Sequence, residues 1–538
     1  MSQAKNQNYL HGAAILAAGV VIMKILGAIY KIPLQNLLGD TGYGYFYVAY
    51  SIYNVFLTIS SAGLPVALSR MISQANTLNR PAQVRRVFRV ALGTFFVIGF
   101  ACSLAMFLFP TELAVMMNSP RASQSILALS PAVVLVCLTS AYRGFVQGHG
   151  NMIPTTVGQV LEVLLKVIVG VALAYFLVSG GKSLPISAAG AVFGTTAGSL
   201  AALVYMYVSC RRNYKNEVRG VGAQDTPDSV GQIVKTLLRI GIPITLGLSV
   251  SSLVSLLDNK LVLYQLKETL HYSEALADEL YGSYSGVQTL FNLPAAFVTP
   301  LTISVVPAVA AALARRDSRE AGKVAASALR VTALLALPMG IGLSVLSEPI
   351  VRVVYPSTNA VGGPLLCSLG IASIFVCITL ITNALLQANG NEKLPMLSMV
   401  VGGLVKVAVN WILVGNPEVN IHGAPIGTIC CYGAICVMNL FFLRRHMAHP
   451  PAILPSLVRP FFSAAIMGAA AWGVYGLARQ VTASMSSAWL GTALAMCAAM
   501  AVAVVLYVAL VILTRAITLE DMRLIPKGEK LARLLRIR

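Results

Sequence analysis

Long apolar segments, separated by short polar ones, run through the whole chain. Most apolar segments are roughly 20–25 residues long, the length of α-helix that crosses a hydrocarbon core of about 30 Å. The pattern predicts an all-α polytopic membrane protein with fourteen transmembrane helices. The predicted spans are 10–33, 43–68, 86–109, 124–147, 154–178, 186–209, 236–263, 284–312, 327–346, 362–388, 394–415, 421–443, 456–478 and 488–514.

The composition supports a membrane protein. Hydrophobic residues make up 57% of the 538 residues, charged residues only 11%, and the mean hydropathy is +0.77. A soluble protein carries roughly 25% charged residues, so this class is excluded. The nine cysteines lie mostly within the predicted spans and lack metal-ligand spacing, so we interpret them as packing residues and expect no metal site.

Lysine and arginine are concentrated in alternate polar segments. Arg85 and Arg86 follow the second span and Arg211 and Arg212 the sixth, whereas segments after odd-numbered spans carry few cations and segment 264–283 is acidic. By the positive-inside rule, both termini are expected in the cytoplasm, which requires an even number of spans. These loops account for the formal net charge of +20, so we expect no nucleic-acid partner.

One group of residues occurs twice, about 240 positions apart. Gln147, Gly150, Asn151 and Lys166 recur as Gln387, Gly390, Asn391 and Lys406. The repeat matches spans 4–6 with spans 10–12, which predicts two six-helix lobes in parallel orientation with a binding site at their interface. The predicted organisation is an N-lobe at 1–212, a cytoplasmic linker at 213–235, a C-lobe at 236–446, two additional spans within 447–514, and a cytoplasmic basic amphipathic tail at 515–538.

A few charged residues lie well inside the spans. A charge at the centre of a membrane helix costs about 2.5–3.5 kcal/mol, so it normally faces a bundle interior or an aqueous cavity. The cations in this position outnumber the single carboxylate, which predicts a site for an anion. The predicted anion-site residues are Lys24, Arg143, Lys166 and Lys406, and the carboxylate is Glu162.

The spacing of these charges leaves alternatives open. Glu162 and Lys166 are four residues apart, so they also fit a self-neutralising ion pair on one helix. Lys406 has Gly402 at the position matching Glu162, so we expect its charge to be more available to a ligand. Lys31 shares a helix face with Lys24, or else it extends to the membrane interface. Additional candidates are Lys31, Arg70, Glu162, Asp258 and Asn410, of which Arg70 and Asp258 also fit interfacial positions near span ends.

Motifs of catalysis are not apparent. The six histidines are scattered near span ends, and neither a Ser/His/Asp set nor a phosphate-binding GxxxxGK[ST] loop is present. We therefore expect a protein that is not an enzyme, uses no cofactor and does not hydrolyse ATP directly. The sequence does not identify an ion whose gradient would drive transport.

Several segments resemble a known family. Residues 141–154 (AYRGFVQGHGNMIP), 24–34 (KILGAIYKIPL) and 63–70 (GLPVALSR), together with the repeated segment ending at Lys406 and Asn410, are similar to the stage V sporulation protein B branch of polysaccharide exporters. That branch belongs to the multidrug/oligosaccharidyl-lipid/polysaccharide (MOP) flippase superfamily. The resemblance implies a V-shaped transporter of two six-helix lobes that works by alternating access, with the last two spans forming a groove for a lipid tail.

The resemblance also implies a substrate. We expect a monomeric flippase of the bacterial cell membrane that moves an undecaprenyl-pyrophosphate-linked cell-wall precursor from the inner to the outer leaflet. Lipid II is the leading candidate for this precursor. Outward movement of negative charge is favoured by about 2.3 kcal/mol per charge per 100 mV. Alternatives are an exporter of another lipid-linked unit of capsule, spore or teichoic type, and a multidrug or cation antiporter, which would need carboxylates in its cavity. A membrane-embedded transferase would need acidic metal ligands, and 264–283 is the one acidic loop.

Overall fold

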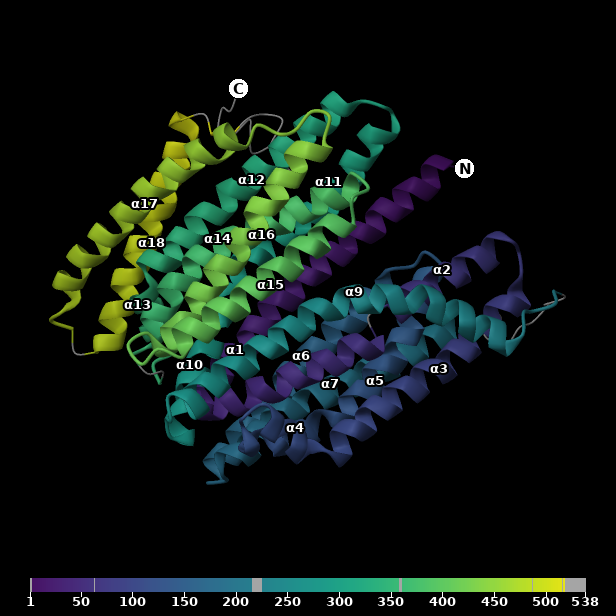
Figure 1. Ribbon diagram of the computed structural model, residues 1–538, viewed down its shortest axis with the longest axis horizontal. Coiled ribbons are helices and arrows are strands. Elements are labelled where there is room, and N and C mark those ends of the chain that lie inside the picture. Colours follow the sequence, from purple (N-terminus) through teal and green to yellow (C-terminus); the bar gives the residue numbers. More distant parts are fainter. Residues whose placement is uncertain are drawn as a thin grey trace. The chain divides into compact units, whose positions relative to one another are not determined.

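The computed structural model describes residues 2–61, 63–214, 225–357, 360–485, 487–514 and 516–517, with side chains from residue 19 onward except at 20, 21, 24, 247, 248, 250, 251 and 303. The described residues are mostly helical and contain no strand. The chain forms two compact units, Met1–Gly282 and Ser283–Arg538 (Figure 1). The predicted tail at 515–538 lies outside the described residues, apart from 516–517.

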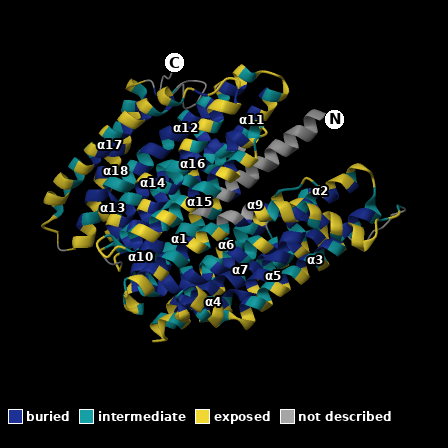
Figure 2. Cartoon of the chain, viewed as in Figure 1, coloured by how far each residue is buried: buried dark blue, intermediate teal, exposed yellow. Residues whose placement is uncertain are grey.

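The first unit is built from long helices with short connections. They are α1 (Ser2–Ser61), α2 (Leu64–Thr77), α3 (Pro81–Leu108), α4 (Pro110–Met116), η1 (Pro120–Ala122), α5 (Ser123–Gly148), α6 (Ile153–Ser179), α7 (Leu184–Asn213), α9 (Val230–Tyr264) and η2 (Gln265–Thr269). α10 (Glu274–Phe291) begins in this unit and ends in the next. Figure 2 shows buried residues concentrated where α5 and α7 pack together.

The second unit continues the same construction. Its helices are α11 (Leu293–Ala314), α12 (Ser318–Val345), α13 (Ser347–Val354), α14 (Gly362–Ala388), α15 (Lys393–Val414), η3 (Asn420–His422), α16 (Gly423–His446), α17 (Ile453–Thr482) and α18 (Ala488–Leu513). Prolines lie in the first turn of many of these helices, where the missing N–H group has no intrahelical partner to lose.

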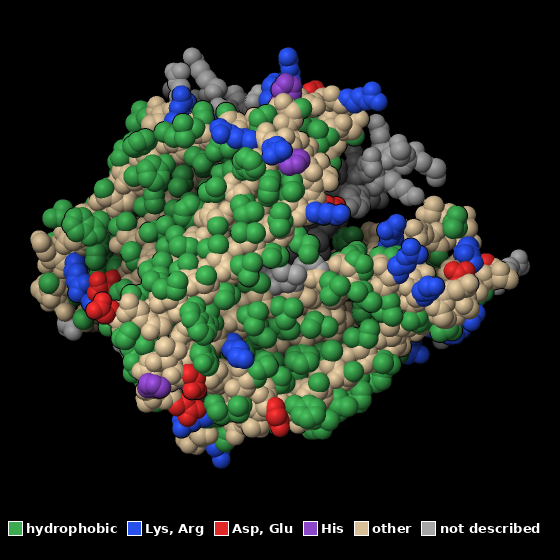
Figure 3. Space-filling view, in the orientation of Figure 1, with side chains coloured by type: hydrophobic (Ala, Val, Ile, Leu, Met, Phe, Trp, Pro, Cys, Tyr) green, Lys and Arg blue, Asp and Glu red, His purple; other side chains and the backbone are tan. Residues whose placement is uncertain are grey.

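Twelve helices among the described residues are long and apolar enough to cross a membrane. Large hydrophobic side chains such as Trp472 and Val505 are 71% exposed, and hydrophobic side chains cover much of the visible surface (Figure 3). A surface of this kind is expected to contact lipid. The predicted class, an all-α polytopic membrane protein, is confirmed, while the count of fourteen spans stays a prediction.

Two predicted spans, 10–33 and 43–68, involve the one long helix α1. Gly39 interrupts it with φ +66°, a backbone conformation that glycine adopts without strain. The amine of Lys31 lies 5.8 Å from the ring centre of Tyr47, although sixteen residues of straight helix would extend about 24 Å. α1 therefore turns back sharply at Gly39, and its two segments lie against each other.

The predicted linker at 213–235 is described only in part, because residues 215–224 lie outside the described residues. The described end of the linker is hydrogen-bonded to the start of α3. The carboxylate of Asp225 accepts hydrogen bonds from the N–H groups of Ala82 (2.7 Å) and Gln83 (3.0 Å), which caps α3 from a distant part of the chain. Burial raises the pKa of Asp225, but these N–H groups and Arg80 more than offset this effect, so the pKa lies below its usual value.

α9 belongs to the first compact unit, where it packs against α1 and α2. The N-lobe at 1–212, the C-lobe at 236–446 and the additional spans within 447–514 stay predictions.

Two glycines let α7 approach α6 very closely. A Cβ atom on Gly198 would lie 2.3 Å from the carbonyl oxygen of Glu162, and one on Gly194 would lie 2.6 Å from that of Lys166. The two glycines are one turn apart, the small-xxx-small spacing by which membrane helices bring their backbones together. The closest backbone contact therefore lies at the turn of α6 that carries Glu162 and Lys166.

Replacement of Gly198 by alanine tests this contact. We expect Gly198→Ala to lower the free energy of unfolding by about 1–3 kcal/mol, because the added methyl group forces the two backbones apart. Denaturation of the purified protein in detergent measures the change. Gly93→Ala on α3 is the matched control, because a Cβ atom there meets nothing within 4 Å. Equal stability of the two variants would contradict the close approach.

Candidate functional site

Lys166 on α6 is held by two tyrosines of α1. Its amine donates a hydrogen bond to the hydroxyl of Tyr50 at 3.1 Å, and lies 4.4 Å from the ring centre of Tyr50 and 5.0 Å from that of Tyr30. Tyr30 is fixed in turn, because its hydroxyl donates to the carbonyl oxygen of Ala191 on α7 at 2.7 Å. The negative faces of the aromatic rings stabilise the ammonium group inside the helix bundle.

Lys31 approaches the same aromatic group from α1. Its amine lies 5.8 Å from the ring centre of Tyr47 and 5.9 Å from that of Tyr50. Two lysine amines, one from each helix, therefore converge on the ring of Tyr50. The two amines place positive charge near one ring, which raises the local electric potential.

A polar cavity of about 260 Å³ is lined by Lys31 and by Tyr50, whose ring Lys166 contacts. The amide of Asn259 donates to the hydroxyl of Ser51 at 2.9 Å, and the hydroxyls of Thr58 and Ser252 are 3.0 Å apart. Such polar side chains in membrane helices usually line a substrate path or a water-filled space. The cavity is lined by Lys31, Tyr47, Tyr50, Ser51, Asn54 and Thr58 of α1 and by Ser252, Ser255, Leu256 and Asn259 of α9.

Most of these cavity residues were not predicted as site residues. A signal for them is present in the sequence, because Tyr47, Ser51, Asn54 and Thr58 follow the spacing of one helix face within an otherwise apolar span. The contribution of α9 has no such signal, because only the packing of α1 against α9 brings Ser252 and Asn259 to this face.

Arg143 and Glu162 form a second charged pair in this unit. The Nη2 atom of Arg143 on α5 donates to Glu162 on α6 at 2.6 Å, and Ser199 on α7 donates to the other carboxylate oxygen at 3.3 Å. Both charged side chains are largely buried, with 13% and 19% of their surfaces exposed. The ion pair of Glu162 is therefore with Arg143 and not with Lys166, whose amine contacts Tyr50 and Tyr30 instead.

The remaining predicted residues lie elsewhere. Arg70 is exposed on α2, and Asp258 is buried on α9 next to Asn259. Lys406 and Asn410 belong to α15 of the second unit, where Lys406 is half-buried and interacts with neighbouring groups. The side chain of Lys24 lies outside the described residues. The structure thus brings together Lys31 with Lys166, and Arg143 with Glu162.

Metal-ligand geometry is absent from the described part of the chain, which contains no group of three or more His, Cys, Asp or Glu side chains arranged for a metal ion.

Comparison with protein families identifies the chain. A family model described as "Polysaccharide biosynthesis protein" matches residues 9–312, which is more than half of the chain. The chain belongs to the polysaccharide biosynthesis protein family. A second model, described as "MatE", matches residues 273–412. The resemblance to MOP flippases noted from the sequence is confirmed, and the family consists of transporters and flippases of lipid-linked saccharides rather than enzymes.

Two relatives match most of the chain. Stage V sporulation protein B of Bacillus subtilis (strain 168) is 25% identical over 459 residues, which are 84% of this chain and 85% of that protein. Lipid II flippase MurJ of the same organism is 24% identical over 486 residues, which are 86% of this chain and 87% of that protein. The similarity to the two relatives is nearly equal.

Solved structures show the MOP fold. A structure of lipid II flippase MurJ in the inward closed conformation matches with a TM-score of 0.65 at 13% identity, over 93% of this chain and 99% of that chain. An inward-facing multidrug resistance transporter of the MATE family matches with a TM-score of 0.64 at 16% identity, over 81% of this chain and 98% of that chain. This family member is therefore a multi-pass membrane protein with the MOP fold.

The pair of Arg143 and Glu162 can be tested by a double-mutant cycle. We expect a coupling free energy of about 1–3 kcal/mol between Arg143→Gln and Glu162→Gln, because each single change leaves a largely buried charge without its partner. Unfolding of the four proteins in detergent measures the coupling.

The control is the pair of Arg352 and Glu348 on α13, whose side chains are 53% and 61% exposed. Solvent-exposed pairs at this helical spacing couple by only about 0.3–0.5 kcal/mol. A coupling at Arg143 and Glu162 as small as that of the control would contradict the structural role of the buried pair.

Proposed function

We propose that this protein is a flippase that moves an undecaprenyl-pyrophosphate-linked cell-wall precursor from the inner to the outer leaflet of the bacterial cytoplasmic membrane. Lipid II is the leading candidate for this substrate. The observation that carries the proposal is the convergence of Lys31 and Lys166 on Tyr50 beside a polar cavity. A pyrophosphate group needs cations to replace its water of hydration. The same cavity offers tyrosine rings, hydroxyl groups and amide groups that suit a saccharide.

The charges of the site favour an anionic substrate over a cation. Glu162 is the carboxylate nearest to Lys166 along α6, and it is bound by Arg143 and Ser199. Lys166 therefore presents a positive charge that Glu162 does not neutralise, and Lys31 adds a second cation at the ring of Tyr50. A cation antiporter with the same fold would need a carboxylate that faces its cavity, and no carboxylate lines this one among the described residues.

The rest of the predicted anion site completes the proposal. Lys24 lies seven residues before Lys31 in the sequence, and Lys406 is the repeat equivalent of Lys166. In this proposal they bind the pyrophosphate at other stages of transport, while Arg143 positions Glu162. Both termini lie in the cytoplasm and the protein acts as a monomer.

A second candidate is the export of another lipid-linked saccharide, such as a spore or capsule unit. The nearly equal identity to stage V sporulation protein B and to lipid II flippase MurJ favours it. Both candidates share the polyprenyl-pyrophosphate group, so the anion site serves either.

Growth rescue tests the substrate and the site together. We expect the wild-type protein to restore growth of a bacterium depleted of its own lipid II flippase. Lys166→Gln should lower lipid II transport about ten- to hundredfold, the effect of losing one charged hydrogen bond to phosphate, and Lys166→Arg should retain part of it. Transport of labelled lipid II in proteoliposomes gives the rate.

Lys182→Gln is the matched control, because Lys182 is exposed between α6 and α7. It should transport at the wild-type rate. Full transport by a Lys31→Gln, Lys166→Gln double variant would contradict the anion site. Failure of the wild-type protein at normal membrane levels would contradict lipid II and favour the second candidate, which transport of other polyprenyl-pyrophosphate saccharides then tests.

A further inference from the structure

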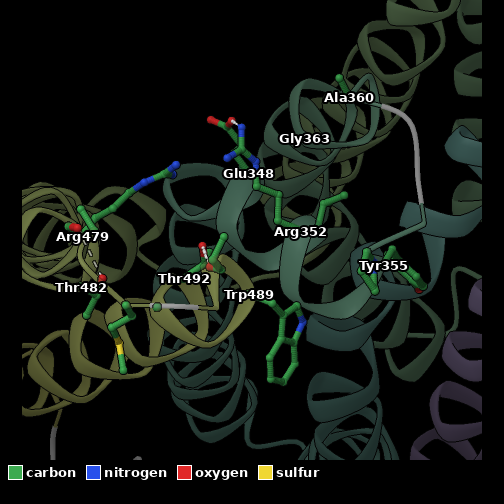
Figure 4. A pocket seen from close by; sticks show the side chains of 15 residues that line it. Glu348, Arg352, Tyr355, Ala360, Gly363, Arg479, Thr482, Trp489 and Thr492 are labelled. Carbon is green, nitrogen blue, oxygen red and sulfur yellow. Dashed lines mark hydrogen bonds and ion pairs between the residues drawn. The ribbon is translucent and has the colours of Figure 1, made fainter.

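A larger cavity, of about 640 Å³, lies in the second unit. It lies between α13, the start of α14, the end of α17 and the start of α18 (Figure 4). Its size is typical of sites for small ligands. The charged and aromatic residues that line it are Glu348, Arg352, Tyr355, Arg479 and Trp489.

Two arginines supply positive charge from opposite walls. In Figure 4, the side chains of Arg352 on α13 and Arg479 on α17 extend toward each other. Arg352 is paired with Glu348. Arg479 donates to the hydroxyl of Tyr475 at 3.1 Å, and no carboxylate pairs with it among the described residues. The described lining therefore carries a net positive charge, and arginine is the side chain whose planar donors best match the oxygens of a phosphate group.

Trp489 gives the cavity a fixed wall. Its indole N–H group donates to the carbonyl oxygen of Val353 at 3.2 Å, which fastens the first turn of α18 to α13. Trp489 is also 50% exposed. A partly exposed tryptophan with its N–H group bonded is typical of the depth where lipid headgroups meet the hydrocarbon core. The position of Trp489 at this end of the unit fits the level of lipid headgroups.

The surface beside the cavity is apolar. Leu477 and Val481 on α17 are 67% and 77% exposed, and Leu490 on α18 is 44% exposed. Val481 and Leu490 are direct neighbours in sequence of the lining residues Thr482 and Trp489. A ligand with a phosphate group and attached acyl chains satisfies both features at once, whereas free phosphate satisfies only the first.

We propose that this cavity binds the phosphate headgroup of an anionic phospholipid, with the acyl chains lying along α17 and α18. This cavity shares no lining residue with the lysine cavity, so its ligand can be tested without the transported substrate. Arg479 is the principal phosphate ligand, and Arg352 contributes when it turns from Glu348.

The fluorescence of Trp489 provides a local readout. The chain has three tryptophans, and a Trp411→Phe, Trp472→Phe protein retains only the one that lines the cavity. In a non-ionic detergent, we expect dihexanoyl-phosphatidylglycerol to change this fluorescence with saturation. Arg479→Gln should raise the half-saturating concentration about tenfold, and Arg479→Lys should raise it less.

Three comparisons decide between the sources of the phosphate. An equal response to dihexanoyl-phosphatidylcholine would overturn the preference for an anionic lipid. An equal response to inorganic phosphate at the same concentration would overturn the lipid as the ligand. Arg444→Gln, which removes an exposed arginine from the last turn of α16 in the same unit, should leave the titration unchanged.

The proposal stays testable if Arg479→Gln does not fold. In the protein with Arg479 intact, an increase of NaCl from 0.1 to 1 M should raise the half-saturating concentration severalfold, because salt screens the contact between an exposed arginine and phosphate. A titration that does not change with salt, or with Arg479→Gln in a monodisperse preparation, would overturn the proposal.

Discussion

A lysine amine inside an apolar helix bundle has to be held by other groups, and the arrangement of the first unit follows from how Lys166 is held. Its amine is bound by a tyrosine hydroxyl and by the faces of two rings, all on α1. Aromatic rings stabilise a cation without neutralising it. The bundle can therefore contain the charge without the neutralisation that an ion pair with a carboxylate would bring.

The glycines of α7 make this arrangement possible in space. With Gly194 and Gly198 against α6, the backbones meet at the turn that carries both Glu162 and Lys166. Ser199, next to Gly198 in sequence, then reaches Glu162, and Arg143 approaches the same carboxylate from α5. Close packing thus directs the negative charge of this turn toward α5 and α7, and the positive charge toward α1.

The sequence predicts the class of protein and most of the helices well, because the length of an apolar span depends only on membrane thickness. It also identifies the cations within spans, because each is exceptional there. It does not predict their partners. The spacing of Glu162 and Lys166 suggested an ion pair on one helix, but three neighbouring helices supply other partners. The part played by Tyr50 and Asn259 depends on how α1 packs against α6 and α9, and helical periodicity carries no information about that packing.

The break in α1 at Gly39 separates Lys31 from Tyr47 and Tyr50 in the chain, yet folds them together in space. Any change in the bend at this one residue moves an ammonium group relative to the aromatic surface that stabilises it. The backbone conformation at Gly39 therefore determines both the shape of α1 and the distance between the amine of Lys31 and these rings. In the proposed anion site, the backbone conformation of a residue without a side chain therefore sets the electric potential that the substrate meets.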